Sequence, residues 1–481
     1  MKRVFFVAIM IVALLTTISC SSDKGQLVGA KDRGMVSDEM PYGMVFVKQG
    51  HMLMGVGDQD AAYTYTYSAK NVTVSSFYMD ETEITNNEYR QFVEWVRDSI
   101  AHVLLGEAEV EDENEHFLKY GKGHEEEGEL VEPRLINWKT KIDWNSQNEE
   151  YAAALSPIYS SPASGNERYY HYKMVDLNAK VLVFEYWWLD RRNYRDSEDP
   201  DVIGAAFKDF DNIDPQTEDQ GMYQNRPIAY SQGSKPFRRH ERINIYPDTL
   251  CWIHDYAYSY NEPMTESYFW HPGYDNYPVV GVSWRQAQAF CAWRTHIRNS
   301  YLISSGQWAY EQKFRLPNEV EWEYAARGDA DLNSYTWGGP YIQNTKGCFL
   351  ANFKPQRGNY SADGGVYPII VAHYHPNDWG LYDMAGNVSE WCEDAFSESA
   401  YNFAHDLNMQ YNYYAKKSDN EALKRKVVRG GSWKDISYYL HNETRSYEYQ
   451  DSGKCYVGFR CVQSYIGRER GDNIKTASNV Y

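Results

Sequence analysis

The stretch Arg429-Gly430-Gly431-Ser432-Trp433 leads towards a second motif, Gly458-Phe459-Arg460-Cys461, and together they frame the segment that decides fold and function. Cys455 is the only thiol strictly between the two motifs. Asp435 and Leu440 stand just after the first motif, where a carboxylate and an isobutyl group offer no soft metal ligand. Chemistry that needs two neighbouring thiols is therefore not expected in this segment.

Further motifs stand in a defined order upstream, and their order is more informative than any single one. They occupy residues 43–47, 54–55, 77–80, 83–86, 278–284, 315–328, 337–338 and 380–391, with a predicted helix over 286–293. The set resembles the sulfatase-modifying, formylglycine-generating enzyme family. The resemblance implies an α+β, loop-rich fold that is distantly like C-type lectins and carries a long insertion.

The resemblance also bears on catalysis. Oxidases of the family hold copper with a pair of thiols shortly after the Gly-Gly-Ser stretch, at the positions of Asp435 and Leu440 in this chain. Cu(I) prefers soft thiolate ligands, so this pair of residues is not expected to bind it. We therefore expect a degenerate catalytic centre, no copper and no enzyme activity.

Composition predicts a globular chain and limits its partners. The chain has 481 residues, of which 43% are hydrophobic, and its 43 Tyr and 15 Trp recur beside Gly and Asn rather than at helical spacing. This pattern favours short strands and loops with few long helices. The formal charge of −19 argues against nucleic acid or anionic lipid headgroups as ligands.

The N-terminus predicts export and lipidation. Lys2 and Arg3 precede an apolar run, and small or polar residues lead to Cys20, so residues 1–19 resemble a bacterial lipoprotein signal peptide. Cys20 would then carry the lipid, and residues 20–40 would be a tether. The alternative is a plain secretory signal with an incidental cysteine.

The remaining chain is expected to form one domain over 41–466, interrupted by an insertion at about 100–275 and followed by a polar tail, 467–481. Alternation predicts strands over 72–74, 77–79 and 181–188. A helix should begin near Thr85 or Asn86 and bury Tyr89, Phe92, Val93 and Val96 on one face. The insertion's acidic run, 107–129, and its aromatic residues are either a partner surface or a solvated flap over an enlarged core.

Two calcium sites are implied by the resemblance, and hard oxygen ligands suit that ion. One would use the side chains of Asp383 and Glu390 with the carbonyls of Met384, Gly386 and Val388. The other would use the side chains of Asn352 and Asp363 with the carbonyls of Phe353 and Gly365. The alternative is that both are Gly-Asn turns with capped carboxylates. If calcium binds, its role would be structural.

Other candidate groups are weaker or structural. Besides Cys20 there are six cysteines, and the resemblance implies a disulfide between Cys291 and Cys461, with the pairing of Cys251, Cys348, Cys392 and Cys455 left open. His373 and His375 would share a face if they lay on a strand, but no third ligand is evident. Structural ion pairs are expected between the arginines 429, 445 and 460 and the glutamates 319, 321 and 323.

The chain is similar over nearly its full length, and especially over 77–90 and 277–284, to outer-membrane lipoproteins of gliding motility and type IX secretion, the K class (PorK/GldK type). This likeness implies a non-catalytic scaffold on the periplasmic face that forms a homo-oligomeric ring with a periplasmic partner of the N class (PorN/GldN type). Two alternatives stay open. A working copper oxidase would need Cys455 to enter the site, and a carbohydrate-binding module would use a Trp-rich cleft.

Overall fold

The computed structural model describes residues 40–55, 69–108, 116–118, 135–159, 177–189, 238–255, 264, 267–305, 311–328, 333–355 and 364–467. Nearly all of them belong to one unit, Met40–Tyr465. The expected signal peptide, Cys20, the tether and most of the acidic run lie outside the described residues.

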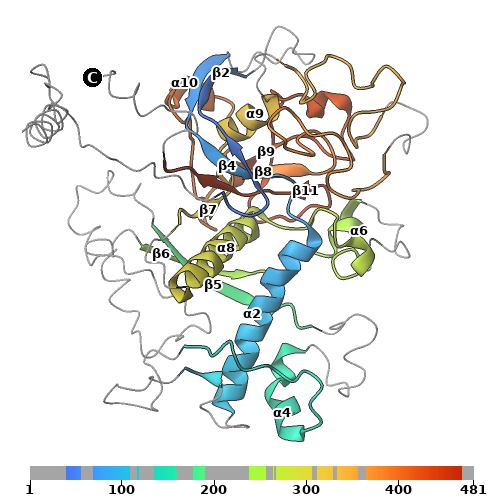
Figure 1. The fold of residues 1–481 in the computed structure, drawn as a ribbon. Helices are drawn as coiled ribbons and strands as arrows, with labels where there is room; N and C mark the ends of the chain where they lie inside the picture. The colour runs from blue at the N-terminus through green and yellow to red at the C-terminus, as the bar shows by residue number, and fades with distance from the viewer. Residues whose placement is uncertain are drawn as a thin grey trace, which may run out of the picture. The chain divides into compact units, whose positions relative to one another are not determined.

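A four-stranded sheet joins the two ends of the described chain (Figure 1). Its order is β1 (Met44–Val47), β4 (Phe77–Asp80), β12 (Val462–Ser464) and β7 (Phe314–Arg315), and each neighbouring pair is antiparallel. The pairing continues beyond the strands, because Asp80 N–H donates to Cys461 O and Ile84 N–H donates to Phe459 O. The Gly-Phe-Arg-Cys motif therefore lies against the N-terminal motifs.

A second four-stranded sheet carries the other C-terminal motifs. Its order is β10 (Ser446–Tyr449), β9 (Arg425–Arg429), β8 (Ser389–Ala395) and β11 (Val457–Gly458). Strand β11 runs parallel to β8, whereas the other pairs are antiparallel, and an irregularity interrupts the β8–β9 register between Trp391 and Ala395. Every residue of β8 is buried, so this strand crosses the interior.

Two smaller sheets complete the β structure. One pairs β2 (Gly50–Met54) with β3 (Lys70–Val74), and the other pairs β5 (Val183–Leu189) with β6 (Arg238–Asn244) from the insertion. Strands β5 and β6 contact the long helix α8 (Trp284–Ser304). Phe184 of β5 is completely buried in the main core, so part of the insertion's aromatic content fills the interior.

Helix α2 (Asn86–Glu107) begins as its sequence predicts. Thr85 is the N-cap, and Glu88 completes a capping box by accepting from the Thr85 N–H at 2.8 Å. The four predicted core residues of this helix are fully buried: Tyr89, Phe92, Val93 and Val96. They pack in the core that α2 shares with α8. At the start of α8, Ser283 N–H donates to Gln286 Oε1 and Gln286 N–H donates to Ser283 Oγ, so the two residues cap the first turn reciprocally.

Helix α9 (Glu319–Arg327) places three glutamates and Trp322 in the interior between β2, β3, β8 and β9. The other described helices are short: α4 (Glu149–Ala154), η1 (Ser156–Ile158), α6 (Cys251–Asp255), η4 (Pro272–Tyr274), α10 (Ala400–Phe403), η5 (Glu421–Lys424) and η6 (Ser437–Leu440).

The expected fold class is confirmed. The described residues form a mixed α and β structure with long irregular connections, and only α2 and α8 among them exceed 20 residues. The strands predicted over 72–74, 77–79 and 181–188 correspond to β3, β4 and β5. The predicted helix over 286–293 lies within α8.

Candidate functional site

The turn after β9 depends on two glycines. Gly430 and Gly431 have φ values of 93° and 68°, a region that is unfavourable for residues with a Cβ. A Cβ on Gly431 would lie 2.7 Å from Tyr439 O, so a side chain would also collide with the backbone of the following helix. The Gly-Gly pair therefore lets the chain fold back on itself and brings residues 432–440 into a compact loop.

Asp435 is turned into this loop. Its Oδ2 accepts a hydrogen bond from Ser432 Oγ at 2.6 Å, and its N–H donates to Ser432 O. Its carbonyl accepts from Lys354 N–H at 2.8 Å. Partial burial raises the pKa of Asp435, and the bond from Ser432 opposes that rise. The carboxylate thus closes a local turn.

Leu440 packs as a core residue. It lies at the end of η6, is 1% exposed, and belongs to an apolar cluster with Tyr335, Ala351, Phe353 and Ala385. The isobutyl side chain of Leu440 has no metal-binding or nucleophilic group. The second position that holds a thiol in the oxidases is filled here by hydrocarbon.

The remaining thiols of this region lie elsewhere. Cys455 is fully buried in a separate cluster beside Trp433, and its carbonyl accepts from Trp433 Nε1 at 3.2 Å. Cys392 is buried in a third cluster, and burial raises its thiol pKa well above the usual value. A raised pKa lowers the thiolate population that copper binding or nucleophilic attack requires. In the described part of the chain, neither thiol joins the cluster around Leu440.

The turn around Asp383 is the better candidate for a cation. Asp383 has a φ of 55°, is 7% exposed, and accepts from Ala372 N–H through Oδ2. Its Oδ1 is buried and has no hydrogen-bond partner among the described residues. Burial raises the pKa of Asp383 to about 6. An orphaned carboxylate oxygen in a Gly-containing turn suits a hard cation.

Two further carboxylates lie close to Asp383. Both oxygens of Glu390 are engaged, because Arg460 donates to both and Trp322 Nε1 donates to Oε2 at 2.8 Å. Glu83 is fully buried and accepts from Val388 N–H at 3.0 Å and from Asn387 Nδ2 at 2.7 Å. Its pKa is raised well above the usual value, first by burial and then by the charges of Asp383 and Glu390.

The residues present fit a cation only in part. Three buried carboxylates lie near the single charge of Arg460, and the raised pKa values of Glu83 and Asp383 show that negative charge is unfavourable there without a cation. The described residues contain no group of three or more His, Cys, Asp or Glu side chains arranged to hold a metal ion. Backbone carbonyls of the turn would have to supply most ligands, with Asp383 as the fitting side chain. Glu390 is less suited, because Arg460 already occupies it.

Sequence reasoning gave Glu83 no role. It stands two residues before the cap of α2, and Thr85 performs the capping. Its partners, Asn387 and Val388, are some 300 positions away in the chain, so no local pattern pointed to them.

The second expected calcium site is described only in part, since Asp363 lies outside the described residues. Asn352 Oδ1 accepts from Gly365 N–H at 3.1 Å, and Asn352 Nδ2 donates to Tyr367 O at 3.0 Å. Phe353 is buried in the cluster with Leu440. Asn352 therefore fixes a turn through both ends of its amide, and the calcium site expected here stays a prediction.

The expected arginine network exists with a different pairing. Arg445 makes two bonds to Glu319, and Arg429 bonds to Glu323. Arg460 instead pairs with Glu390. Glu321 pairs with Arg315, whose Nη1 and Nη2 donate to Glu321 Oε2 and Oε1, each at 2.6 Å. The expectation was wrong for Arg460 and Glu321, because strand register decides which carboxylate each guanidinium reaches.

A comparison with protein families identifies the fold family. The model of the sulfatase-modifying factor enzyme 1-like domain (FGE-sulfatase) matches residues 32–171 and 242–465, which is more than half of the chain. The chain belongs to this family. The resemblance seen in the sequence motifs is thereby confirmed at the family level.

Relatives of this FGE-sulfatase protein include both inactive and active members by name. One is the inactive C-alpha-formylglycine-generating enzyme 2 of Bos taurus, 34% identical over 203 residues, which are 41% of this chain and 53% of the relative. Another is the formylglycine-generating enzyme of Streptomyces coelicolor, 32% identical over 199 residues, 40% of this chain and 54% of the relative. The chain thus spans about half the length of these relatives.

Among solved structures, PvdO from Pseudomonas aeruginosa is similar, with 14% sequence identity and a TM-score of 0.41, covering 88% of this chain and 94% of PvdO.

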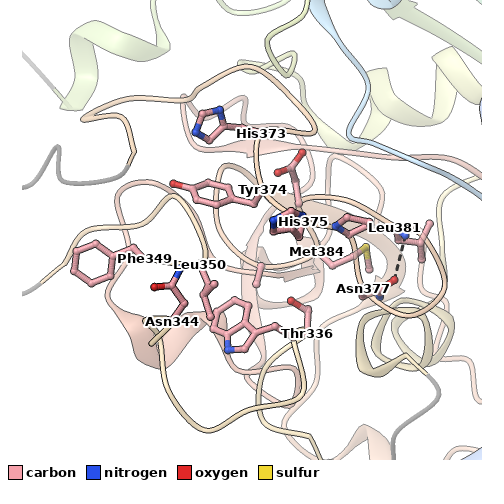
Figure 2. Close-up of a pocket in the computed structure, with 14 residues that line it drawn as sticks. Thr336, Asn344, Phe349, Leu350, His373, Tyr374, His375, Asn377, Leu381 and Met384 are labelled. Carbon is pink, nitrogen blue, oxygen red and sulfur yellow. Dashed lines mark hydrogen bonds between the residues drawn. The ribbon is translucent and has the colours of Figure 1, made fainter. Parts of the chain in front are cut away.

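A cavity of about 220 Å³ opens beside the Asp383 turn of this FGE-sulfatase domain (Figure 2). Trp337, which stacks on Tyr335 at 4.8 Å, forms part of its wall together with Asn344 and Phe349. His373 and His375 also line it, but they lie in a loop and not on a strand. Their rings are well separated in Figure 2, so the pair does not converge on one point.

Cys291 and Cys461 lie together in the main core of the FGE-sulfatase domain. Their Sγ atoms are 3.5 Å apart, and both residues are buried. No disulfide is present among the described residues. The two sulfurs are in contact but farther apart than a bond of about 2.05 Å, so the implied disulfide stays a prediction.

Proposed function

We propose that this protein is a non-catalytic structural lipoprotein of the type IX secretion and gliding machinery. In this proposal it forms a ring on the periplasmic face of the outer membrane, together with a periplasmic partner of the N class. The family membership supplies the fold, and the sequence likeness to the K class supplies the role. The alternative remains a working formylglycine-generating oxidase.

The observation that carries the non-catalytic part is the packing of Leu440. A copper oxidase of this family needs two thiolates in the loop after the Gly-Gly turn, and that loop holds Asp435 bonded to Ser432 and Leu440 inside an apolar cluster. Cu(I) binds neither group well. Cys455 cannot reach the Leu440 position without leaving its own buried cluster. That some relatives are named inactive is compatible with this proposal.

The location rests on the N-terminal sequence. The lipoprotein-type signal ending at Cys20 supports an anchor by lipid. In the described part of the chain, no helix combines the length and apolar character that crossing a bilayer requires. The formal charge of −19 favours a neutral or basic protein partner over nucleic acid.

The test is to extract the native protein from outer membranes in mild detergent, measure the particle size, and identify co-eluting proteins by mass spectrometry. We expect a particle of megadalton scale with one stoichiometric periplasmic partner. A monomer without a partner contradicts the scaffold role. The matched control is Cys20→Ser, which should move the protein to the soluble periplasmic fraction, whereas continued membrane retention places the anchor elsewhere.

The oxidase alternative is tested with the same preparation. Copper-loaded protein is incubated with a cysteine-containing sulfatase peptide, and formylglycine is measured by peptide mass. We expect no conversion, since the thiol pair is missing. Turnover at a rate that depends on copper overturns the non-catalytic proposal.

We also propose that a structural calcium ion binds at the Asp383 turn. The orphaned Oδ1 of Asp383 supports this, and so does the raised pKa of the neighbouring Glu83, which a bound cation would lower. When bound, calcium would supply positive charge and cross-link the loop. Asp383 and turn carbonyls would hold it, and Glu83 would contribute its charge.

A second candidate function, glycan binding, is favoured by the cavity beside Trp337. Its volume of about 220 Å³ is below that of drug-sized pockets, which measure about 300–1,000 Å³, and suits one sugar ring. Trp337 offers an aromatic face, and Asn344, His373 and His375 offer hydrogen-bonding groups. Binding on a glycan array that Trp337→Ala abolishes would support this function.

A further inference from the structure

Cys251 and Cys455 come from distant parts of the chain and meet in one buried cluster. Cys251 begins α6 in the insertion, and Cys455 lies just before β11. They are 3% and 0% exposed and share the cluster with Trp252, Trp433 and Val280, among others. By contrast, Cys392 packs in another cluster, so it is not a neighbour of either.

Gly281 is the point at which the two segments approach each other. Its N–H donates to Lys454 O at 2.9 Å, and its carbonyl accepts from Asp248 N–H at 2.8 Å. The segments that hold Cys455 and Cys251 are therefore hydrogen-bonded to the same residue, one to its N–H and the other to its carbonyl. A Cβ at position 281 would lie 3.2 Å from Cys251 Sγ, and 2.4 Å from Asp248 O. The absence of a side chain, with a φ of 75°, leaves room for the segment that holds Cys251.

We propose that Cys251 and Cys455 form a second disulfide in the mature protein. This inference rests on the proposed function in one respect, since an envelope location supplies the oxidising environment in which disulfides persist. The bond would fasten the insertion to the C-terminal segment that precedes the Gly-Phe-Arg-Cys motif. It would be distinct from the Cys291–Cys461 pair, which lies in the main core.

The redox step balances with a thiol–disulfide oxidoreductase as oxidant. The Cys251 thiolate attacks the oxidant's disulfide, which releases one oxidant thiolate and leaves a mixed disulfide. The Cys455 thiolate then attacks the Cys251 sulfur, forms the Cys251–Cys455 bond and releases the second oxidant thiolate. Two protons pass to the oxidant, which leaves as a dithiol. Because both cysteines are buried in the folded protein, this exchange has to precede final packing.

The bond would act on the loop that holds the former catalytic positions. Trp433 Nε1 donates to Cys455 O at 3.2 Å, and the Trp433 ring stacks on Trp252 with centroids 6.1 Å apart. Trp252 follows Cys251 directly. A covalent link between the two cysteines would therefore hold the Trp252–Trp433 stack together and fix the chain next to Asp435.

The experiment uses the full-length protein, purified from the envelope of cells that export it. Thiols are blocked with N-ethylmaleimide under denaturing, non-reducing conditions, and the digest is mapped by mass spectrometry. We expect one linked peptide pair that contains Cys251 and Cys455, and a second that contains Cys291 and Cys461. The Cys291–Cys461 pair serves as the internal control for an oxidising compartment.

The outcomes separate the inference from the function on which it rests. If Cys291–Cys461 is linked while Cys251 and Cys455 are alkylated or paired with other cysteines, the inference is overturned and the envelope location stands. If all four of these thiols are alkylated, the inference falls and the envelope location falls with it.

Variants provide an independent measurement. Cys251→Ser and Cys455→Ser should each expose the partner thiol to alkylation after denaturation and lower the melting temperature. The double variant should melt no lower than the worse single variant, because each change removes the same bond. Cys392→Ser should leave the mapped disulfides unchanged. Additive losses in the double variant, with no newly alkylated partner thiol in the singles, contradict the bond.

Discussion

Arg460 and Glu390 form a fully buried fork that joins the last sequence motif to strand β8. Arg460 Nη2 lies 2.5 Å from Glu390 Oε1, and Nε lies 2.8 Å from Oε2, while both side chains are at most 1% exposed. The same guanidinium also donates to Tyr382 O at 2.8 Å. One side chain thus satisfies a buried carboxylate and a carbonyl of the Asp383 turn.

Replacing Arg460 with Met should destabilise the protein strongly. The substitution leaves Glu390 charged and buried without its partner, and breaking such a pair costs about 3–5 kcal/mol. The free energy of unfolding, measured by denaturant titration, should fall by that amount. Lys424→Met is the matched control, because Glu421, its partner at 2.7 Å, is exposed, and such pairs contribute about 1 kcal/mol or less. Equal losses in the two variants contradict the structural role of the fork.

Calcium should stabilise the wild-type protein through Asp383. At a concentration of about 100 times Kd, a ligand that binds only the folded state adds about 2.7 kcal/mol. The melting temperature should therefore rise with calcium and fall on chelation. Asp383→Asn removes the charge while preserving shape, so its melting temperature should respond little to either treatment. An unchanged calcium response in this variant would place the ion elsewhere.

The stability of the protein should fall between about pH 4 and pH 7 because of Asp394. Burial raises the pKa of this carboxyl to about 7, whereas its unfolded value is about 4. The folded state therefore binds the proton more tightly, and the stabilisation present below pH 4 is lost as the pH rises through 7. Denaturant titrations across this range measure the slope of the free energy of unfolding against pH. Asp394→Asn should flatten it, and an unchanged slope would exclude Asp394 as its source.

Leu440→Ala should destabilise the loop without affecting chemistry. Truncating a buried Leu costs about 2–5 kcal/mol, depending on how far the cavity collapses. Unfolding free energy is the readout, and Ile436→Ala is the control, since Ile436 is 55% exposed on the same loop. Comparable losses at both positions would show that Leu440 is not a core residue.

Asp435→Ala should leave secretion intact at normal protein level. Among the described residues the carboxylate bonds to Ser432 in its own loop, whereas the bond from Lys354 N–H goes to the backbone carbonyl of Asp435, so the substitution removes one local turn bond. Secretion of a cargo protein by cells that carry the variant is the measurement. A secretion defect with unchanged abundance would show that the loop of residues 432–440 contributes to secretion.

The sequence predicted those features that local chemistry fixes. The start of α2 near Thr85, its buried face and the alternation of β3 depend on neighbours within a few residues, and all are found. Strand β4 forms where it was predicted, but all four of its residues are buried, so its two faces do not alternate in exposure. The prediction that Asp435 and Leu440 stand where oxidases of the family carry two thiols likewise needed no coordinates. The ordered motifs were sufficient for the family, which the family comparison confirms.

Tertiary structure alone decided the pairings over long separations. Arg460 pairs with Glu390 and not with a glutamate of α9, because β11 pairs with β8 and sets Gly458, two residues before Arg460, opposite Glu390. Glu83 joins the Asp383 turn across some 300 residues, and Cys251 and Cys455 share one buried cluster. A sequence gives the side chains of a protein and the interactions between residues that are close along the chain. Which distant groups share a buried, low-dielectric site depends on packing, because burial sets both the pairing and the pKa of each group.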